Sequence, residues 1–155
     1  MKETIRLVKI ENADEKANIV SEVLEDLADW FGIPEATKAY IDAARELPLW
    51  AARNGKELIG FITLSESSPE TGEIHCMGVK RAYHRKGIGK LLFDALEEYA
   101  RGSYKFLQVK TVEEGHYEAY DKTVAFYKAL GFSKLEVFPS LWDIENPCLI
   151  MIKAL

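Results

Sequence analysis

The sequence predicts a mixed α+β fold built on a mostly antiparallel central sheet, and three features lead to that class. Asn54 and Gly55 stand between two apolar segments, which is a strong signal for a hairpin of antiparallel strands. The apolar run that ends at Val79 leads into a segment of clear helical period, and a further strand follows that helix. A strand, a helix and a strand in succession form a right-handed crossover between parallel neighbours. The sheet is therefore expected to combine hairpins with one parallel crossover.

The first half of the chain is expected to form a strand, two helices and a three-strand meander. Alternating residues predict a strand at 4–10. Asn12 or Asp14 can then cap a helix whose apolar face recurs until Gly32. Pro34 suits the first position of a second helix. The meander is expected at 49–53, 57–64 and 73–79, with turns at 54–55 and 67–72.

The second half predicts two further helices and three strands. A helix is expected at 87–101, and Gly102 ends it. Its apolar face is expected to hold Ile88, Leu91, Leu92, Ala95, Leu96 and Tyr99. Asp121 can cap a last helix, which carries Tyr127 and ends at Gly131. Strands are expected at 106–111, 132–138 and 148–153. The predicted order is β-α-α-β-β-β-α-β-α-β-β, with about six to seven strands and about four helices.

Length and composition limit the possible functions. A chain of 155 residues, of which 48% are hydrophobic, is expected to form a single domain over residues 1–155. Its net charge of -5 opposes a nucleic-acid partner. Because the sequence shows no apolar leader and no membrane-spanning window, we expect a soluble, cytoplasmic protein without a membrane partner. Cys76 and Cys148 lack metal-like spacing, so they are expected to be reduced core thiols, and no metal is expected.

The most informative segment is His84 to Lys90, where two glycines open a helix inside a basic cluster. Five cations lie within eleven residues, namely Lys80, Arg81, Arg85, Lys86 and Lys90. A helix start exposes backbone N–H groups and carries the positive end of the helix dipole, and glycines let an anion approach closely. This combination predicts a phosphate site, since the local positive charge opposes the acidic balance of the whole chain.

Spacing argues against two common phosphate-binding loops. A Walker loop needs Ser or Thr after its lysine, whereas Leu91 follows Lys90. A dinucleotide fingerprint needs a third small residue at the position that Leu92 occupies. A tight turn with solvated cations remains the alternative to a phosphate site.

Two motifs in order resemble the GNAT superfamily of N-acetyltransferases. The string VKRAYHRKGIGKLL, which begins at Val79, is similar to the acyl-CoA-binding motif of that family, with His84 in place of the usual Gln or Arg. The string KTVAFYKALGF at 122–132 resembles the next motif, in which a tyrosine precedes a Gly-Phe stop. Tyr120 and Thr123 occupy positions where many members carry asparagine and alanine. The resemblance extends along most of the chain and implies a GNAT-like fold.

The resemblance also implies that acetyl-CoA is the cosubstrate. Strand backbone near Val79 is then expected to bond the pantetheine arm and to donate to the oxyanion, and amides from Arg85 to Lys90 are expected to hold the pyrophosphate. The expected cofactor-binding residues are Met77, Val79, His84, Arg85, Lys86, Gly87, Ile88, Gly89 and Lys90. The pyrophosphate part of this expectation also follows from the residues themselves.

Acetyl transfer to an amine needs a base, an oxyanion donor and an acid for the departing thiolate. Glu73 and His75 lie two residues apart in a strand, so both face the same way as Met77, and either could accept the proton of the amine. The resemblance makes Tyr127 the acid, since a phenol can protonate a thiolate. The alternatives are an exposed Glu, a half-buried His and a core aromatic ring.

Segments outside the two motifs are expected to select the acceptor. Trp30, Phe31 and Trp142 are the candidate substrate-binding residues, and 113–117 and 139–147 are candidate loops. We expect an acetyl-CoA-dependent N-acetyltransferase that acts on a primary amine of a small molecule, with a protein lysine or N-terminus as the second acceptor class. A non-catalytic acyl-CoA sensor and a module that binds an acidic protein are the alternatives, and a homodimer is left open.

Overall fold

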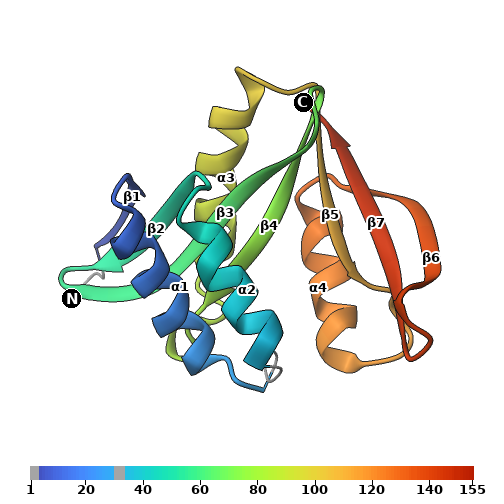
Figure 1. Cartoon of the computed structure of the whole chain (residues 1–155), viewed down its shortest axis with the longest axis horizontal. Coiled ribbons are helices and arrows are strands. Elements are labelled where there is room, and N and C mark those ends of the chain that lie inside the picture. Colours follow the sequence, from blue (N-terminus) through green and yellow to red (C-terminus); the bar gives the residue numbers. More distant parts are fainter. Residues whose placement is uncertain (1–3, 30–33) are drawn as a thin grey trace. The chain divides into compact units, whose positions relative to one another are not determined.

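The structure of the protein is a computed structural model that describes residues 4–29 and 34–155 (Figure 1). Its elements are β1 (Ile5–Ile10), α1 (Ala13–Asp26), α2 (Pro34–Ala44), β2 (Leu49–Asn54), β3 (Glu57–Ser68), β4 (Thr71–Val79), η1 (Arg81–Tyr83), α3 (Ile88–Arg101), β5 (Phe106–Val112), α4 (Glu118–Ala129), β6 (Ser133–Asp143) and β7 (Asn146–Ala154). The strands hydrogen-bond as a seven-stranded sheet in the order β1-β2-β3-β4-β5-β7-β6. β4 and β5 pair in parallel, whereas β1–β2, β2–β3, β5–β7 and β6–β7 pair antiparallel. The predicted α+β class and the predicted element order are confirmed.

The chain divides into two compact units. Unit 1 comprises Met1–Ser65 and His75–Tyr99, and unit 2 comprises Glu66–Ile74 and Ala100–Leu155. Strand β4 contributes its first residues to unit 2 and the rest to unit 1. The single-domain organisation stays a prediction.

In unit 1, α1 and α2 pack their apolar residues against one face of the strands (Figure 1). α1 begins after Asn12, whose side chain accepts a hydrogen bond from the Glu15 N–H at 2.9 Å, so one of the two predicted caps is confirmed. The helix ends at Asp26 rather than at Gly32, which lies outside the described residues. α2 begins at Pro34 as predicted. The N–H of a first helical residue has no acceptor within the helix, so proline, which lacks an N–H, is well suited to this position. The core of this face includes Ile19, Val23, Leu24, Leu49, Phe61 and Cys76.

Helix α3 buries much of the predicted face, including Ile88, Leu92 and Leu96, but Leu91 and Tyr99 are exposed and Phe93 is buried in addition. Leu91 and Tyr99, which the sequence places on the apolar face, are 41% and 45% exposed. The Tyr99 ring lies edge-on to Trp50, with ring centroids 5.3 Å apart, and the Lys9 ammonium lies over that ring. The helical period alone could not show that Leu91 and Tyr99 lie outside the buried face. Apolar residues at the edge of that face recur at the same spacing as the residues that contact the sheet.

Two glycines allow close approach between neighbouring elements of unit 1. A Cβ at Gly60 of β3 would meet the Gly78 carbonyl oxygen at 2.7 Å and Leu92 Cδ1 at 3.3 Å. A Cβ at Gly78 of β4 would meet methyl carbons of Val23 and Leu27 at 3.0 and 3.1 Å. The absence of side chains at these positions therefore lets the end of β4 lie against α1 and β3.

In unit 2, β5, β7 and β6 form an antiparallel sheet, and α4 packs on β5. Leu107, Val109 and Thr111 of β5 are buried, whereas Gln108 is half-buried and Lys110 is exposed, so the strand alternates between a covered and an open face. Over the described residues, the parallel ladder between β4 and β5 joins 71–73 to 106–108. Both strands continue beyond the last pair of this ladder.

Several predicted boundaries are wrong. α4 begins at Glu118 rather than after Asp121, and the Asp121 carboxylate instead accepts a hydrogen bond from the Gly115 N–H at 2.7 Å. The candidate loop at 139–147 is the end of the β6–β7 hairpin. Pro139 lies within β6, which is tolerated because β6 is an edge strand where a missing N–H leaves no ladder bond unmade. The turn predicted at 67–72 is also shorter, since β3 and β4 extend into it.

Among the described residues, no helix has both the length and the apolar character needed to cross a membrane. The same part of the chain holds no group of three or more His, Cys, Asp or Glu side chains arranged for a metal ion.

Candidate active site

The basic turn of unit 1 carries the geometry of an anion site. The chain leaves β4 through the short helix η1 and enters α3 at Ile88. Arg85 and Gly87 adopt left-handed backbone conformations, with φ of 63° and 77°. The first hydrogen bond of α3 runs from the Leu91 N–H to the Gly87 carbonyl at 3.2 Å. The amides of 88–90 therefore have no acceptor within the helix, and such amides bind anions when a turn brings one close.

His84 ties this turn to the end of β4. Its Nε2 donates a hydrogen bond to the Val79 carbonyl at 2.5 Å, and its backbone N–H donates to the Arg81 carbonyl at 3.2 Å. The Lys80 N–H donates to the Ile59 carbonyl of β3 at 2.8 Å. The histidine found where the resemblance expects Gln or Arg therefore has a structural role, and its predicted contact with the cosubstrate stays a prediction.

Acids from elsewhere in the fold neutralise much of the basic cluster. Three of its cations form ion pairs: Lys80 with Glu22, Arg81 with Asp29 and Lys90 with Asp94. The Lys86 ammonium lies 5.4 Å from the centre of the Tyr83 ring. Within the described ranges 4–29 and 34–155, Arg85 has no ion-pair partner. The sequence could not show the first two of these pairs, because Glu22 and Asp29 come from α1 and the segment just after it, whereas Lys90 and Asp94 lie four residues apart on α3.

The residues of β4 alternate in burial along the whole strand. Glu73, His75, Met77 and Val79 are half-buried, whereas the residues between them are buried, so the predicted sharing of one strand face is confirmed. In unit 1, the His75 ring lies edge-on to Tyr40 of α2, with centroids 5.4 Å apart and an interplanar angle of 73°. Sequence reasoning did not single out Tyr40, because only the packing of α2 on the strands brings it to β4.

In unit 2, three side chains converge on one oxygen of Glu73. Its Oε1 accepts hydrogen bonds from the Gln108 amide at 2.6 Å and from the Ser67 hydroxyl at 3.1 Å. The Lys110 ammonium lies 3.3 Å from the same atom, as an ion pair. None of these three residues was expected at the site. The alternation of β5 could have put Gln108 and Lys110 on one face, but the register with β4 was needed to place them beside Glu73.

Tyr127 of α4 lies in the aromatic core of unit 2. Its ring packs edge-on against Phe126 and Phe132, with centroids 5.3 and 5.6 Å apart. The Phe132 N–H donates to the Tyr127 carbonyl at 3.0 Å and so closes the end of the helix. Tyr127 is only 6% exposed, which suits a positioned proton donor and also suits a core aromatic residue.

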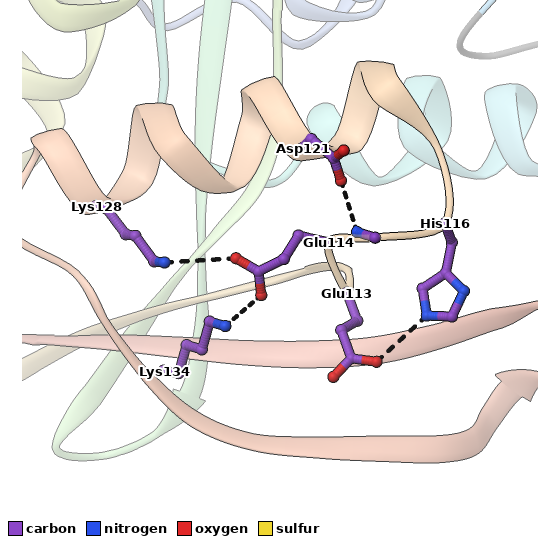
Figure 2. A network of polar contacts seen from close by, with 7 residues as sticks. Glu113, Glu114, His116, Asp121, Lys128 and Lys134 are labelled. Atoms are coloured by element: carbon purple, nitrogen blue, oxygen red, sulfur yellow. Dashed lines mark hydrogen bonds and ion pairs between the residues drawn. The ribbon is translucent and has the colours of Figure 1, made fainter.

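A polar network joins the β5–α4 connection to its neighbours (Figure 2). The Glu114 carboxylate forms ion pairs with Lys134 of β6 and with Lys128 of α4. Hydrogen bonding from Lys134, helped by Lys128, holds the pKa of Glu114 below its ordinary value despite partial burial. The hydrogen bond between Gly115 and Asp121 lies in the same network. These contacts fix the connection that leads into the helix of Tyr127.

The predicted acceptor residues lie in different parts of the chain. Trp142 lies on β6, near the end of the β6–β7 hairpin, and is 47% exposed. The Tyr117 hydroxyl donates to the Glu145 carbonyl at 3.2 Å, which links the start of α4 to that hairpin. Burial, with Tyr117 close by, raises the pKa of Tyr120. Trp30 and Phe31 lie outside the described residues.

Both thiols are buried, as predicted, and have no disulfide partner. Burial raises the pKa of Cys76 to about 12 and raises that of Cys148 as well.

Comparisons with known proteins give the family. The profile described as "Acetyltransferase (GNAT) family" matches residues 13–132. The chain therefore belongs to the GNAT family of acetyltransferases, and the predicted resemblance is confirmed.

Two sequence relatives and one solved structure illustrate this relationship. N-alpha-acetyltransferase RimI of Mycobacterium tuberculosis is 33% identical over 87 residues, which cover 54% of this chain and 51% of that protein. Mycothiol acetyltransferase of Corynebacterium glutamicum is 33% identical over 88 residues, or 57% of this chain and 28% of that protein. A GNAT family acetyltransferase from Elizabethkingia anophelis, solved with acetyl-CoA bound, has a TM-score of 0.65 at 17% identity and matches over 99% of this chain and 100% of its own. This chain spans about half the length of the first relative and less of the second.

Proposed function

We propose that the protein is an N-acetyltransferase that transfers an acetyl group from acetyl-CoA to a primary amine of a small molecule. Membership of the GNAT family supports the reaction type. The observation that carries the proposal is the turn at 84–90, where helix amides and two left-handed residues follow the end of β4. A cytoplasmic location and a homodimer stay predictions.

The turn fits the diphosphate of acetyl-CoA. Amides of 88–90 and the side chains of Arg85 and Lys86 supply donors for anionic oxygens, and hydrogen bonds with charged partners are the stronger ones. Because His84 already holds the turn against β4, less ordering is required when the anion binds. When bound, acetyl-CoA supplies the acetyl group as a thioester.

Two side chains on one face of β4 are proposed to receive the proton of the amine. His75 offers a ring nitrogen, and Glu73 offers Oε2, since its Oε1 is already occupied by three donors. Either group can act directly or through a water molecule. The proposed base is therefore the pair Glu73 and His75.

Tyr127 is proposed as the acid. In the transfer, the amine nitrogen forms a bond to the acetyl carbon, and the bond between that carbon and sulfur breaks. The amine proton goes to the base on β4, and the departing thiolate takes the hydroxyl proton of Tyr127. Backbone N–H near Val79 is the proposed donor to the oxyanion.

A thiol-release assay with acetyl-CoA tests the proposal. The panel should include small primary amines, a lysine-containing peptide and peptides with free N-termini. Turnover with small amines supports the proposed acceptor class, and turnover with peptides alone would replace it with a protein acceptor. If calorimetric titration detected no binding of CoA or acetyl-CoA to folded protein, the proposal would be wrong.

A non-catalytic acyl-CoA sensor is the second candidate. The observation that favours it is the departure from the family's second motif at Tyr120 and Thr123. This candidate predicts calorimetric binding of acetyl-CoA without thiol release for any amine in the panel.

A further inference from the structure

The cluster around Glu73 in unit 2 presents two opposite charges side by side. Gln108, Ser67 and Lys110 all contact Oε1 of Glu73, at 2.6, 3.1 and 3.3 Å. Among the described residues, Oε2 of this carboxylate has no hydrogen-bond or ion-pair partner. The Glu73 side chain is 14% exposed, and Oε2 is not among the buried polar atoms of the described residues that lack a partner, so a ligand can reach it. Oε2 is therefore positioned to accept a hydrogen bond from a ligand.

Lys110 supplies the opposite charge. Its side chain is 37% exposed, and its ammonium carries three donors, of which the ion pair with Glu73 uses one. A second anion can therefore approach the same ammonium while Glu73 stays bound to it. The side chains of Glu73 and Lys110 thus offer an acceptor and spare donors a few ångströms apart.

The position of the cluster also suits a ligand site. Glu73 and Gln108 form the last pair of the β4–β5 ladder in the described residues, and Lys110 lies two residues beyond it on the same face of β5. The opposite face of β5 is the buried one, with Leu107 and Val109. Ile150 and Ile152 of β7 pair with Lys110 and Gln108, so half-buried apolar side chains flank the charges.

We propose that Glu73 and Lys110 recognise the ammonium and the carboxylate of an α-amino acid, which is thereby the acceptor class of this enzyme. The inference rests on the proposed N-acetyltransferase function. In an α-amino acid the two charged groups are attached to the same carbon, so nitrogen and carboxylate oxygen lie about 3 Å apart. That separation matches the adjacent opposite charges of the Glu73–Lys110 pair.

The chemistry of acetylation agrees with this arrangement. The ammonium donates to Oε2 of Glu73 and must lose one proton before its nitrogen can attack, and the base on β4 takes that proton. A bond then forms between nitrogen and the acetyl carbon as the carbon–sulfur bond breaks. Nitrogen loses its second proton to water, and the Tyr127 hydroxyl protonates the departing thiolate, which yields an N-acetylamino acid and CoA thiol. The product retains its carboxylate but has no ammonium, so it loses its charged contact with Glu73 and is released more easily.

Matched acceptors test the proposal in the thiol-release assay. Each amino acid of a panel is compared with its carboxamide, which keeps the amine and the side chain but lacks the carboxylate charge. We expect kcat/KM for the best amino acid to exceed that of its carboxamide about tenfold or more, because one hydrogen bond between charged groups is lost. Lys110→Met is expected to reduce this ratio to near one.

Lys105→Met is the matched control. Lys105 lies just before β5 and forms a solvent-exposed ion pair with Glu70, so its replacement is expected to leave the preference unchanged. Calorimetric titration of the amino acid and of its carboxamide into the complex with CoA gives a readout without turnover, and it should show the same preference. If Lys110→Met does not fold, the wild-type ratio and Lys110→Gln carry the test.

The outcomes separate the two proposals. Turnover of carboxamides or simple amines as fast as of amino acids would overturn the α-amino acid class and leave the acetyltransferase function standing. An unchanged ratio in folded Lys110→Met would overturn the role of Lys110. Absence of thiol release with every amine, despite binding of acetyl-CoA, would contradict the proposed function itself.

Discussion

Alanine substitutions at the two close-approach glycines of unit 1 test how tightly β4 is held before the basic turn. At Gly60, the new Cβ would lie 2.7 Å from the Gly78 carbonyl oxygen, which belongs to backbone and cannot rotate away. At Gly78, the nearest atoms are methyl carbons of Val23 and Leu27, at 3.0 and 3.1 Å, and these side chains can adjust. The two variants therefore add the same methyl group against neighbours of different stiffness.

The expected costs follow from this difference. Overpacking costs about 1–3 kcal/mol, whereas replacing glycine stabilises by about 0.4–1 kcal/mol through the unfolded chain. We expect Gly60→Ala to lower the free energy of unfolding by about 2–3 kcal/mol, since backbone must move. We expect Gly78→Ala to cost about 1 kcal/mol or less, since the gain offsets part of a softer contact. For a chain of this length, the Gly60 value lowers the melting temperature by roughly 4–12 °C.

Urea denaturation measures both free energies, provided that the m-value stays constant. Calorimetric titration with CoA gives a second readout, because movement of the Gly78 carbonyl disturbs the end of β4 from which the turn departs. Gly55→Ala is the control: nothing lies within 4 Å of its Cβ, and only its φ of 61° is strained. It should lose stability and keep CoA affinity. A cost at Gly78 equal to or larger than that at Gly60 would refute the reasoning.

Tyr127→Phe is expected to lower kcat at least about tenfold and to leave acetyl-CoA affinity unchanged, because a proton donor acts mainly in the transition state. Unchanged turnover in the thiol-release assay would remove Tyr127 from the mechanism. Gly89→Glu is expected to abolish CoA binding in calorimetry through bulk and like charge, whereas Gly102→Glu, the same change just beyond the other end of α3, should bind normally. Normal binding by a folded Gly89→Glu protein would contradict the assigned turn. Glu114→Gln is expected to lower the melting temperature by roughly 2–4 °C at neutral pH. The pKa of Glu114 is lowered in the folded protein, so its ion pairs stabilise the fold above the ordinary value of 4.5 and lose that effect as the pH falls below it. The melting temperatures of the two proteins should therefore converge in acid, and a constant difference across pH would exclude the ion pairs as its cause.

The element order was predictable because each signal depends on a few neighbouring residues. The Asn54-Gly55 hairpin, the Asn12 cap and the start of α2 at Pro34 are all present in the structure. The start of α4 was not predictable in this way. Asp121 is a residue type that caps helices, but its carboxylate instead binds the Gly115 N–H, a contact that depends on the path of the preceding loop.

In the candidate site, too, local features were predictable from the sequence and contacts between distant residues were not. The glycines, the amides and the order of the two motifs are visible in the sequence, and they were sufficient to predict the family and the turn. The partners of Glu73 were not visible, since Gln108 lies 35 residues away and becomes its neighbour only through the register of a parallel ladder. The same holds for Tyr40 beside His75, which depends on how α2 packs.

The sequence by itself determined the order of helices and strands, which family the chain belongs to and where an anion can be held, because capping, turn formation and helix amides act over a few residues. Tertiary structure decided which charges remain available. Lys80 and Glu22 are 58 residues apart, and Arg81 and Asp29 are 52 residues apart, yet the fold pairs them and so partly neutralises two cations that the linear sequence had assigned to phosphate. Ion pairs depend on distances of a few ångströms, and only the packing of helices and strands sets most of those distances.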